Sequence, residues 1–302
     1  MSKGEGAISF DAAARRLAAG FVTAPDKPDE TVESTLCALW FAAAGDARPV
    51  NRATPPLPAL DAAQGAGLEA LIARRLAGEP LAYLVGLQEF MGLEFIAAPG
   101  ALIPRRETEL LGGAVLSALT ELLRRRPAPR LLDLCTGCGN LAVLLAHHAP
   151  GAEVVATDLE RAALDIAARN VQHHGYEDRV RLLQGNLFGA LAPLGENPSF
   201  DLISCNPPYL STRHATHMPA EVGAAEPVAA FDGGPFGLSI VLRLLKEAPT
   251  YLAPGGWLCF EIGAGQQGLV EGRIRQQPGY VELRRALDAQ GVVRAYQLHW
   301  QP

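Results

Sequence analysis

The chain has 302 residues, of which 49% are hydrophobic, so it is long enough for one large folded domain and a smaller one. Its formal net charge of −6 excludes the overall basic balance of a general nucleic-acid binder. No apolar run reaches the ~18 residues of a membrane helix, and the N-terminus lacks the apolar segment of a signal peptide. The five cysteines lie mostly in apolar or glycine-rich surroundings typical of reduced thiols, so we expect a cytoplasmic protein without a membrane partner.

The first third of the chain is predicted to form a small helical module. Apolar residues recur at helical spacing over residues 10–21, 32–44 and 67–76, whereas the prolines within 48–60 indicate a loop. Gly86, Gly92 and Gly100 then separate short, partly alternating runs, which predicts a β-hairpin. We expect a helical domain over residues 1–85, a hairpin linker over 86–104 and a larger domain over 105–302.

In the larger domain, strand-like runs alternate with helical ones. Short apolar runs predict strands at residues 131–134, 154–157, 180–183, 200–204 and 256–262, and helices at 110–123, 141–147, 161–174 and 237–248. Two further runs, at 281–284 and 292–298, fit antiparallel edge strands. This alternation predicts an α/β fold, a doubly wound, seven-stranded, mainly parallel sheet with ligands at the carboxyl ends of its strands.

A glycine-rich loop follows the first of these strands. The run from Gly137 to Ala142 fits the dinucleotide fingerprint G-x-G-x-x-A, and Asp158 ends the next strand, where a ribose-binding acid is expected. The fingerprint alone does not separate a nicotinamide cofactor from S-adenosylmethionine. Asp133 favours the latter, because a carboxylate just before the loop is placed to engage the cofactor's ammonium directly or through water; its alternative role is to cap the loop. Asn186 is expected to accept a hydrogen bond from the adenine amino group.

The sequence Asn206-Pro207-Pro208-Tyr209 follows the strand at 200–204. Consecutive prolines lock φ and carry no N–H, so their carbonyls and the Asn206 side chain are left to face a ligand. An amide or amine that donates to the Asn206 side-chain oxygen and the Pro207 carbonyl would be held with its lone pair free, beside the Tyr209 ring. The loop therefore predicts a site that holds an amino group, and the alternative is an ordinary proline-rich turn.

Two other patterns are weaker. Cys135 and Cys138 form a C-x-x-C, but no second Cys or His pair follows at ligand spacing, so we expect neither a zinc nor a redox site. The paired histidines at 147–148 and 173–174 are expected to be solvated helix positions, because adjacent side chains diverge on a helix.

Together these motifs resemble the S-adenosylmethionine-dependent protein-(glutamine-N5) methyltransferases, the class that modifies release factors and a ribosomal protein. The resemblance covers roughly residues 67 to 265 and also includes Tyr83-Leu-Val-Gly86, Ile103-Pro-Arg105, Glu107-Thr108-Glu109 and Phe260-Glu-Ile-Gly263. It implies methyl transfer from S-adenosylmethionine to a planar side-chain nitrogen, with a protein glutamine amide favoured. It also implies a substrate-recognition role for the N-terminal helices and a catalytic role for residues 105–302.

The resemblance and the motifs define the site residues that we expect. The catalytic residues are Asn206, Pro207 and Tyr209. The cofactor is expected to contact Asp133, Thr136, Gly137, Gly139, Asp158, Asn186, Leu187 and Asn206, and the acceptor to contact Arg105, Glu107, Asn206, Pro207, Pro208, Tyr209 and Glu226. No metal is expected.

Some residues depart from the family pattern and leave the acceptor open. Arg106 stands where the family commonly has Pro, Asn186 where it commonly has Asp, and residues 234–238 lack the usual acid. The alternatives are an N-methyltransferase for a free amino acid, guanidine or peptide, an enzyme for an exocyclic amine of a nucleic acid, and a non-catalytic cofactor-binding partner. The acidic composition disfavours the nucleic-acid alternative.

Overall fold

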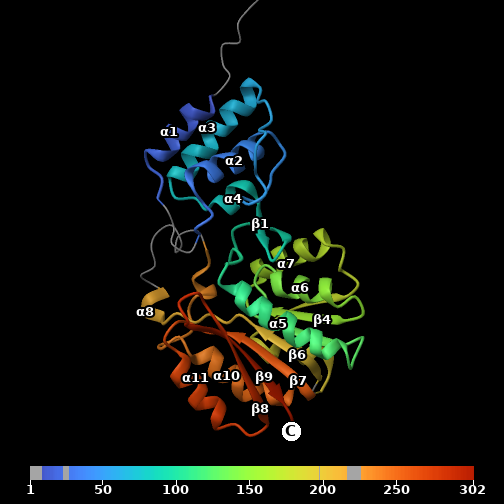
Figure 1. Cartoon of the computed structure of the whole chain (residues 1–302). Helices are drawn as coiled ribbons and strands as arrows, with labels where there is room; N and C mark the ends of the chain where they lie inside the picture. Colours follow the sequence, from blue (N-terminus) through green and yellow to red (C-terminus); the bar gives the residue numbers. More distant parts are fainter. Residues whose placement is uncertain (1–8, 23–26, 197, 216–225) are drawn as a thin grey trace, which may run out of the picture. The chain divides into compact units, whose positions relative to one another are not determined.

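The computed structural model of the chain describes residues 9–22, 27–196, 198–215 and 226–302. The fold consists of two compact units, and the chain passes from the first to the second between Pro99 and Gly100. In Figure 1 the first unit runs from blue to blue-green and the second from green to red. None of the described helices combines the length and apolar character needed to cross a membrane.

The first unit is a helical bundle that ends in a hairpin. Its core is rich in buried leucines at helical spacing. The Trp40 indole N–H donates to the Pro58 carbonyl at 2.8 Å, which connects the proline-rich loop to the helices. The predicted hairpin is present within this unit. Its elements are α1 (Phe10–Ala18), α2 (Val32–Ala43), α3 (Ala62–Leu76), α4 (Leu81–Val85), β1 (Leu87–Phe90) and β2 (Leu93–Ile96).

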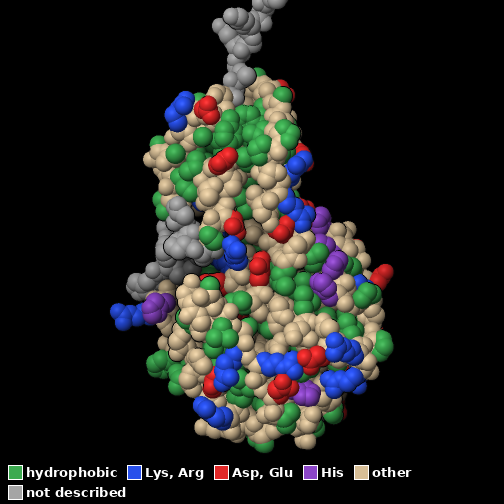
Figure 2. Space-filling view, viewed as in Figure 1, with side chains coloured by type: hydrophobic (Ala, Val, Ile, Leu, Met, Phe, Trp, Pro, Cys, Tyr) green, Lys and Arg blue, Asp and Glu red, His purple; other side chains and the backbone are tan. Residues whose placement is uncertain are grey.

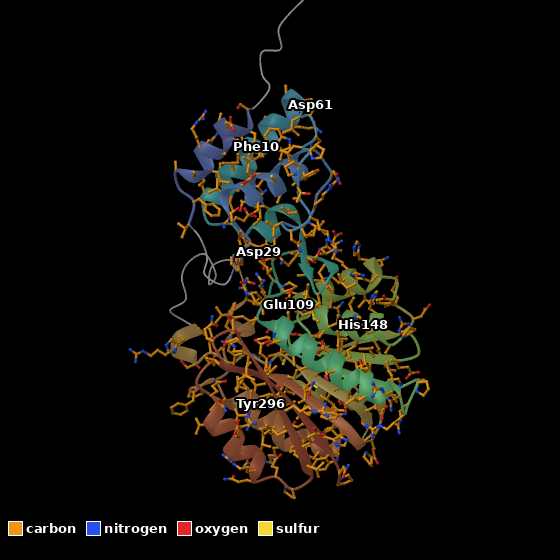
Figure 3. All side chains as sticks on the ribbon, in the orientation of Figure 1. Phe10, Asp29, Asp61, Glu109, His148 and Tyr296 are labelled. Carbon is orange, nitrogen blue, oxygen red and sulfur yellow. The ribbon has the colours of Figure 1, made fainter. Side chains whose placement is uncertain are left out.

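Helix α3 begins five residues earlier than the apolar spacing predicted. Asp61, labelled in Figure 3, accepts from the Gln64 backbone N–H at 2.8 Å, and the Gln64 side-chain oxygen accepts from the Asp61 N–H at 3.0 Å. This reciprocal capping box satisfies two donors of the first turn, so the helix starts in the polar segment before the apolar face appears. The predicted start at Gly67 was therefore wrong.

The second unit is built on a seven-stranded sheet with the order β5-β4-β3-β6-β7-β9-β8. The first five strands in this order are parallel, and β9 is antiparallel to both β7 and β8. The prediction of a doubly wound, mainly parallel seven-stranded sheet is confirmed. The strands are β3 (Arg130–Leu134), β4 (Glu153–Asp158), β5 (Val180–Gln184), β6 (Phe200–Cys205), β7 (Leu252–Glu261), β8 (Tyr280–Leu287) and β9 (Val293–Trp300).

Helices cover both faces of this sheet, with α5, α6 and α7 on one face and α10 and α11 on the other (Figure 1). Helix α11 was not predicted, because Gly268 and Gly272 weaken its helical pattern. The helical elements are α5 (Thr108–Leu123), α6 (Asn140–His148), α7 (Arg161–His173), η1 (Leu187–Leu194), α8 (Thr212–Ala215), η2 (Val228–Ala230), α10 (Ser239–Glu247), η3 (Ala248–Thr250) and α11 (Gln267–Arg275).

The strand order determines where a ligand-binding crevice can form. The chain moves outward in one direction from β3 through β4 to β5 and then returns to place β6 on the other side of β3. The loops that leave the carboxyl ends of β3 and β6 consequently diverge to opposite faces and open a crevice between them, as expected at a topological switch point. The predicted cofactor loop follows β3 and the Asn-Pro-Pro-Tyr loop follows β6, so both border this crevice.

Candidate active site

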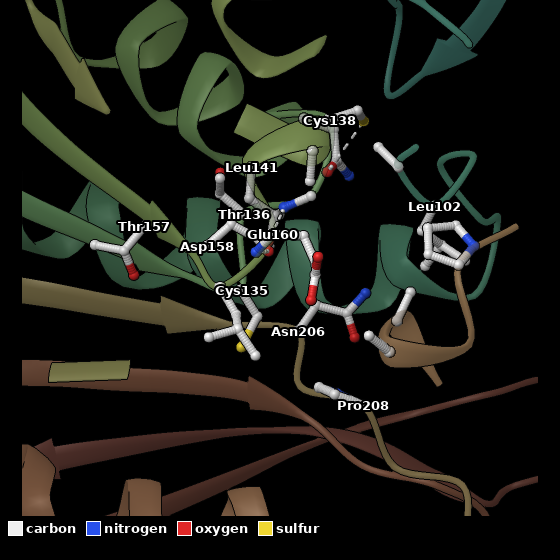
Figure 4. Close-up of a pocket in the computed structure, with 18 of the residues that line it drawn as sticks. Leu102, Cys135, Thr136, Cys138, Leu141, Thr157, Asp158, Glu160, Asn206 and Pro208 are labelled. Carbon is white, nitrogen blue, oxygen red and sulfur yellow. Dashed lines mark hydrogen bonds between the residues drawn. The ribbon is translucent and has the colours of Figure 1, made fainter. Parts of the chain in front are cut away.

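A cavity opens at the carboxyl ends of β3, β4 and β6, entirely within the second unit (Figure 4). Its empty space is about 1050 Å³, including the part that is open to solvent. Eight of the predicted site residues line it, from the cofactor loop, the ends of the strands and the proline-rich loop: Arg105, Thr136, Gly137, Asp158, Asn186, Leu187, Asn206 and Pro208. The cavity therefore brings these eight residues together, and the other predicted site residues lie outside its lining.

Asp158 is held rigidly at the cavity wall. Its Oδ2 accepts from the Gly137 N–H at 2.8 Å and its Oδ1 accepts from the Glu160 N–H at 3.0 Å. Burial raises the pKa of Asp158, and these backbone donors oppose the shift. Each carboxylate oxygen keeps a second lone pair, so the carboxylate can still accept from two neighbouring hydroxyls such as those of a ribose.

Gly137 shapes the loop beside it. Its φ of +56° lies in the left-handed region, and a Cβ built on it would meet no protein atom within 4 Å. Because Gly137 lines the cavity, that open space is where a bound molecule would approach the backbone. Gly139 instead packs against Ala167 of α7 and does not line the cavity.

Asp133 lies behind the loop, outside the cavity lining. It is completely buried, and it accepts from the Thr136 hydroxyl at 2.6 Å and from the Ser204 hydroxyl at 2.7 Å. In this position it matches the loop-capping alternative, and Thr136 is the residue that reaches the cavity. Burial raises the pKa of Asp133 to about 7, although both hydroxyl hydrogen bonds act to lower it.

This raised pKa predicts how stability changes with pH. Asp133 ionises in the unfolded chain near pH 4 but keeps its proton in the folded protein until about pH 7. Its contribution to the free energy of unfolding therefore falls as the pH rises through this window, by up to about 4 kcal/mol. The variant Asp133→Asn stays neutral, so urea unfolding should show its stability relative to wild type rising from pH 5 to pH 7.5. A stability difference that is the same at both pH values would contradict the assignment.

Asn186 lines the cavity, but its side-chain oxygen already accepts a hydrogen bond from the Arg243 guanidinium of α10. The adenine amino group was expected to donate to this same oxygen. Arg243 is in turn paired with Glu247 at 2.6 Å, one helical turn further along α10. The carbonyl oxygen has two lone pairs, so an adenine donor would share Asn186 with Arg243.

The Asn206 side chain lines the cavity in a defined orientation. Its Nδ2 donates to the Thr108 hydroxyl at 3.2 Å, which leaves Oδ1 as an acceptor. Gly237, with a φ of +69°, supports the same loop from behind, because a Cβ there would lie 2.1 Å from the Tyr209 carbonyl oxygen. Pro208 borders the cavity and Pro207 is buried beside it.

Tyr209 does not line the cavity. Its hydroxyl forms a hydrogen bond with the carboxyl group of Glu261 at the end of β7, and burial raises the Tyr209 pKa. Its ring lies close to Gly263, where a Cβ would be 3.1 Å from Tyr209 Cδ2. Glu107 is likewise outside the lining and pairs with Arg294 at 3.2 Å.

Glu226 is a buried support for the segment before α5. Its carboxylate accepts from the Ile103 N–H at 2.8 Å and forms an ion pair with Arg105. The side chain is only 1% exposed, and Glu226 does not line the cavity, whereas Arg105 does. Glu226 is therefore placed to hold Arg105 at the cavity rather than to touch an acceptor in it.

Several residues of the site were not identified from the sequence. Thr108 and Cys135 line the cavity, and Glu261 lies behind Asn206. Thr108 and Glu261 belong to segments noted for the family resemblance, but their contacts depend on segments far apart in the chain. Among the described residues, no cluster of three or more His, Cys, Asp or Glu side chains is arranged to hold a metal ion.

The fold, the strand-end cavity, the fixed Asp158 carboxylate and the open backbone at Gly137 fit S-adenosylmethionine, and they define a class I S-adenosylmethionine-dependent methyltransferase. Comparison with models of known protein families supports this assignment. Residues 113–222 match the methyltransferase small domain and residues 49–86 match the PrmC N-terminal domain. The solved structure of the hMettl16 catalytic domain in complex with the MAT2A 3'UTR hairpin 6 shares the fold, with a TM-score of 0.54 at 17% identity over 76% of this chain and 81% of that chain.

Curated relatives define the family more narrowly. The chain is 42% identical over 230 residues to the release factor glutamine methyltransferase of Geobacter sulfurreducens (76% of each chain) and 41% identical over 268 residues to that of Moorella thermoacetica (89% of each). It is 44% identical over 211 residues to the ribosomal protein uL3 glutamine methyltransferase of Bradyrhizobium diazoefficiens (68% of this chain, 65% of that one). The chain belongs to the PrmC-like glutamine methyltransferase family, whose methyl donor is S-adenosylmethionine.

Proposed function

We propose that this enzyme methylates the side-chain amide nitrogen of a glutamine in a peptide-chain release factor. The observation that carries the proposal is the orientation of Asn206, whose Nδ2 is held by Thr108 so that Oδ1 is left to accept from an NH₂ group. The Pro207 carbonyl has no competing N–H on the following proline and is the second expected acceptor. Together they suit a planar group with two N–H donors, which a glutamine amide has.

The chain's residues do two things for this reaction. Asn206 and Pro207 hold the amide nitrogen so that its lone pair faces the donor. S-adenosylmethionine, when bound, supplies an electrophilic methyl group on a sulfonium. Transfer of this group would give the amide nitrogen a new N–C bond and leave the electron pair of the C–S bond on sulfur. Positive charge would then develop at the amide nitrogen, and the two acceptor oxygens stabilise its N–H groups until one proton is released to solvent water.

The release factor is favoured as the acceptor because the Geobacter and Moorella relatives are release factor glutamine methyltransferases. Both align with a larger share of this chain than the uL3 methyltransferase does. The Moorella enzyme aligns over 89% of both chains, and the match to the PrmC N-terminal domain lies in the helical unit. We assign substrate recognition to that unit and catalysis to residues 105–302. On the face shown in Figure 2, basic and acidic side chains of the second unit are interspersed, a pattern more typical of a protein-binding surface than of a nucleic-acid-binding one.

Ribosomal protein uL3 is a second candidate, because the relative that acts on it is 44% identical to this chain. A labelled-methyl assay separates the two acceptors. We expect methylation of a release factor and its loss when the acceptor glutamine is replaced by asparagine, whose shorter side chain does not bring its amide as far into the cavity. Methylation of uL3 alone would assign the enzyme to the second acceptor. Labelling of small metabolites without either protein would overturn the proposal.

A further inference from the structure

Behind Asn206 lies a buried polar cluster that continues from its contact with Thr108 to Glu261. Glu261 is 1% exposed and Thr108 2% exposed. The parallel register pairs Cys205 of β6 with Phe260 of β7, so Glu261 follows next to Asn206 at the same edge of the sheet. Thr108 opens α5 and joins the two, because its hydroxyl accepts from Asn206 Nδ2 at 3.2 Å.

Glu261 is surrounded by groups from three other segments of the chain. The hydroxyls of Thr108 and Tyr209 form hydrogen bonds with its carboxyl group, and Arg294 at the start of β9 and Glu107 beside α5 are the charged groups that face it. Burial raises the pKa of Glu261 to about 7, Glu107 acts in the same direction, and the two hydroxyls and Arg294 act against it. Its Oε2 has no hydrogen-bond partner among the described residues. Glu261 therefore changes charge near neutral pH inside the wall of the site.

The direction of the hydrogen bonds follows from counting protons. An ionised Glu261 only accepts, so it takes the single hydroxyl proton of Thr108. Thr108 can then only accept from Asn206, and the Asn206 amide must turn its NH₂ to Thr108 and its oxygen to the cavity. If Glu261 is protonated, it can donate to Thr108, and the Thr108 proton becomes available to Asn206 Oδ1. The amide then has a competing orientation in which its own NH₂ faces the NH₂ of the acceptor.

We propose that Thr108 and Glu261 are positioning residues that fix the side-chain amide of Asn206 with its oxygen toward the methyl acceptor. The proposal rests on the proposed function, since it takes an NH₂ group as the ligand of that oxygen. The ionised Glu261 carboxylate accepts the Thr108 hydroxyl proton, and Thr108 is therefore left to accept from the Asn206 NH₂ group. Tyr209 forms a hydrogen bond with the same carboxyl group. The cluster thus selects an acceptor that donates hydrogen bonds over one that accepts them.

The test at Thr108 uses a matched pair. In the full-length enzyme, Thr108→Val keeps the shape and removes the hydroxyl, and kcat should fall about 10-fold, the equivalent of one hydrogen bond to a polar group. Thr108→Ser restores the hydroxyl and should recover kcat to within about twofold, while both variants keep the wild-type Kd for S-adenosylmethionine. Thr120→Val, on the exposed side of the same helix, controls for a threonine lost from α5. Equal losses in the valine and serine variants would overturn the proposal.

The test at Glu261 is a pH profile at saturating cofactor. Wild-type kcat should rise between pH 6 and pH 8 with an inflection near 7 as Glu261 ionises. The inflection should disappear in Glu261→Gln and persist in Asp133→Asn, which removes the other carboxyl group of similar pKa. Carboxyl ¹³C NMR of the folded wild type should show the same titration. A flat wild-type profile, or an inflection kept in Glu261→Gln, would overturn the proposal.

These outcomes are separate from failure of the proposed function. Wild type is first assayed on release factor and on uL3, and labelling of neither would overturn the function. With either acceptor labelled, full activity of Thr108→Val would overturn the positioning roles and leave the function intact.

Discussion

Replacing Asn206 by alanine should lower kcat about 100-fold, because the acceptor amide loses one of the two oxygens that align its nitrogen. The affinity for S-adenosylmethionine should fall far less than turnover does, since Asn206 is one of eight expected cofactor contacts and those of Asp158 and Gly137 are untouched. Single-turnover transfer of labelled methyl to a release factor gives the rate, and calorimetry gives the Kd.

The control for Asn206→Ala is a second variant that loses a side-chain amide far from the cavity. Gln290→Ala removes an exposed amide from the turn between β8 and β9 and should leave both constants unchanged. If Asn206→Ala retained full turnover, Asn206 would not hold the acceptor. If the variant lost turnover but kept cofactor binding and full cellular function, the protein would act as a cofactor-binding partner rather than as an enzyme.

Replacing Asp158 by alanine should weaken binding of S-adenosylmethionine about 100-fold. Two hydrogen bonds from ribose hydroxyls to a carboxylate contribute about 1.5 kcal/mol or more each, and about 1.4 kcal/mol corresponds to a tenfold change in Kd. The substitution also removes the acceptor of the Gly137 N–H, so the loop loses its anchor. Isothermal titration calorimetry measures the effect directly.

Asp165→Ala is the matched control, because this aspartate is exposed on α7 and forms an ion pair with Arg161, one helical turn earlier. We expect its Kd to equal that of wild type. An unchanged Kd in Asp158→Ala would show that the ribose lies elsewhere in the cavity and that the glycine-rich fingerprint marks a structural turn.

The sequence predicted the sheet and the two loops because each depends on local features. Short apolar runs mark buried parallel strands, Gly137 marks a left-handed turn, and consecutive prolines mark a loop without donors. The position of the cavity could be predicted for the same reason. The two motifs each follow a parallel strand, and parallel strands end at the same edge of the sheet. The Asp61–Gln64 capping box is also visible in the sequence. It marks the start of α3 more accurately than the apolar spacing, which begins only at Gly67.

The finer geometry depended on residues far apart in the chain. Asp133 is expected to engage the cofactor's ammonium directly or through water, but the sequence did not indicate that its two oxygens also accept from Thr136 and from Ser204, 71 residues away. Asn186 is bound by Arg243, 57 residues further on. Such partners are set by strand order and helix packing, which local patterns do not encode. A buried polar residue can be recognised from the sequence more readily than the group that satisfies it.

The position of Asp133 has a mechanical consequence. One of its oxygens holds Thr136 of the loop that is expected to carry the methyl donor, and the other holds Ser204, two residues before Asn206 of the loop that is expected to carry the acceptor. A single carboxyl group is thus hydrogen-bonded to the segments that carry both loops. Besides the separate supports of each loop, this shared anchor links the position of the donor loop to that of the acceptor loop, and so to the gap that the methyl group must cross.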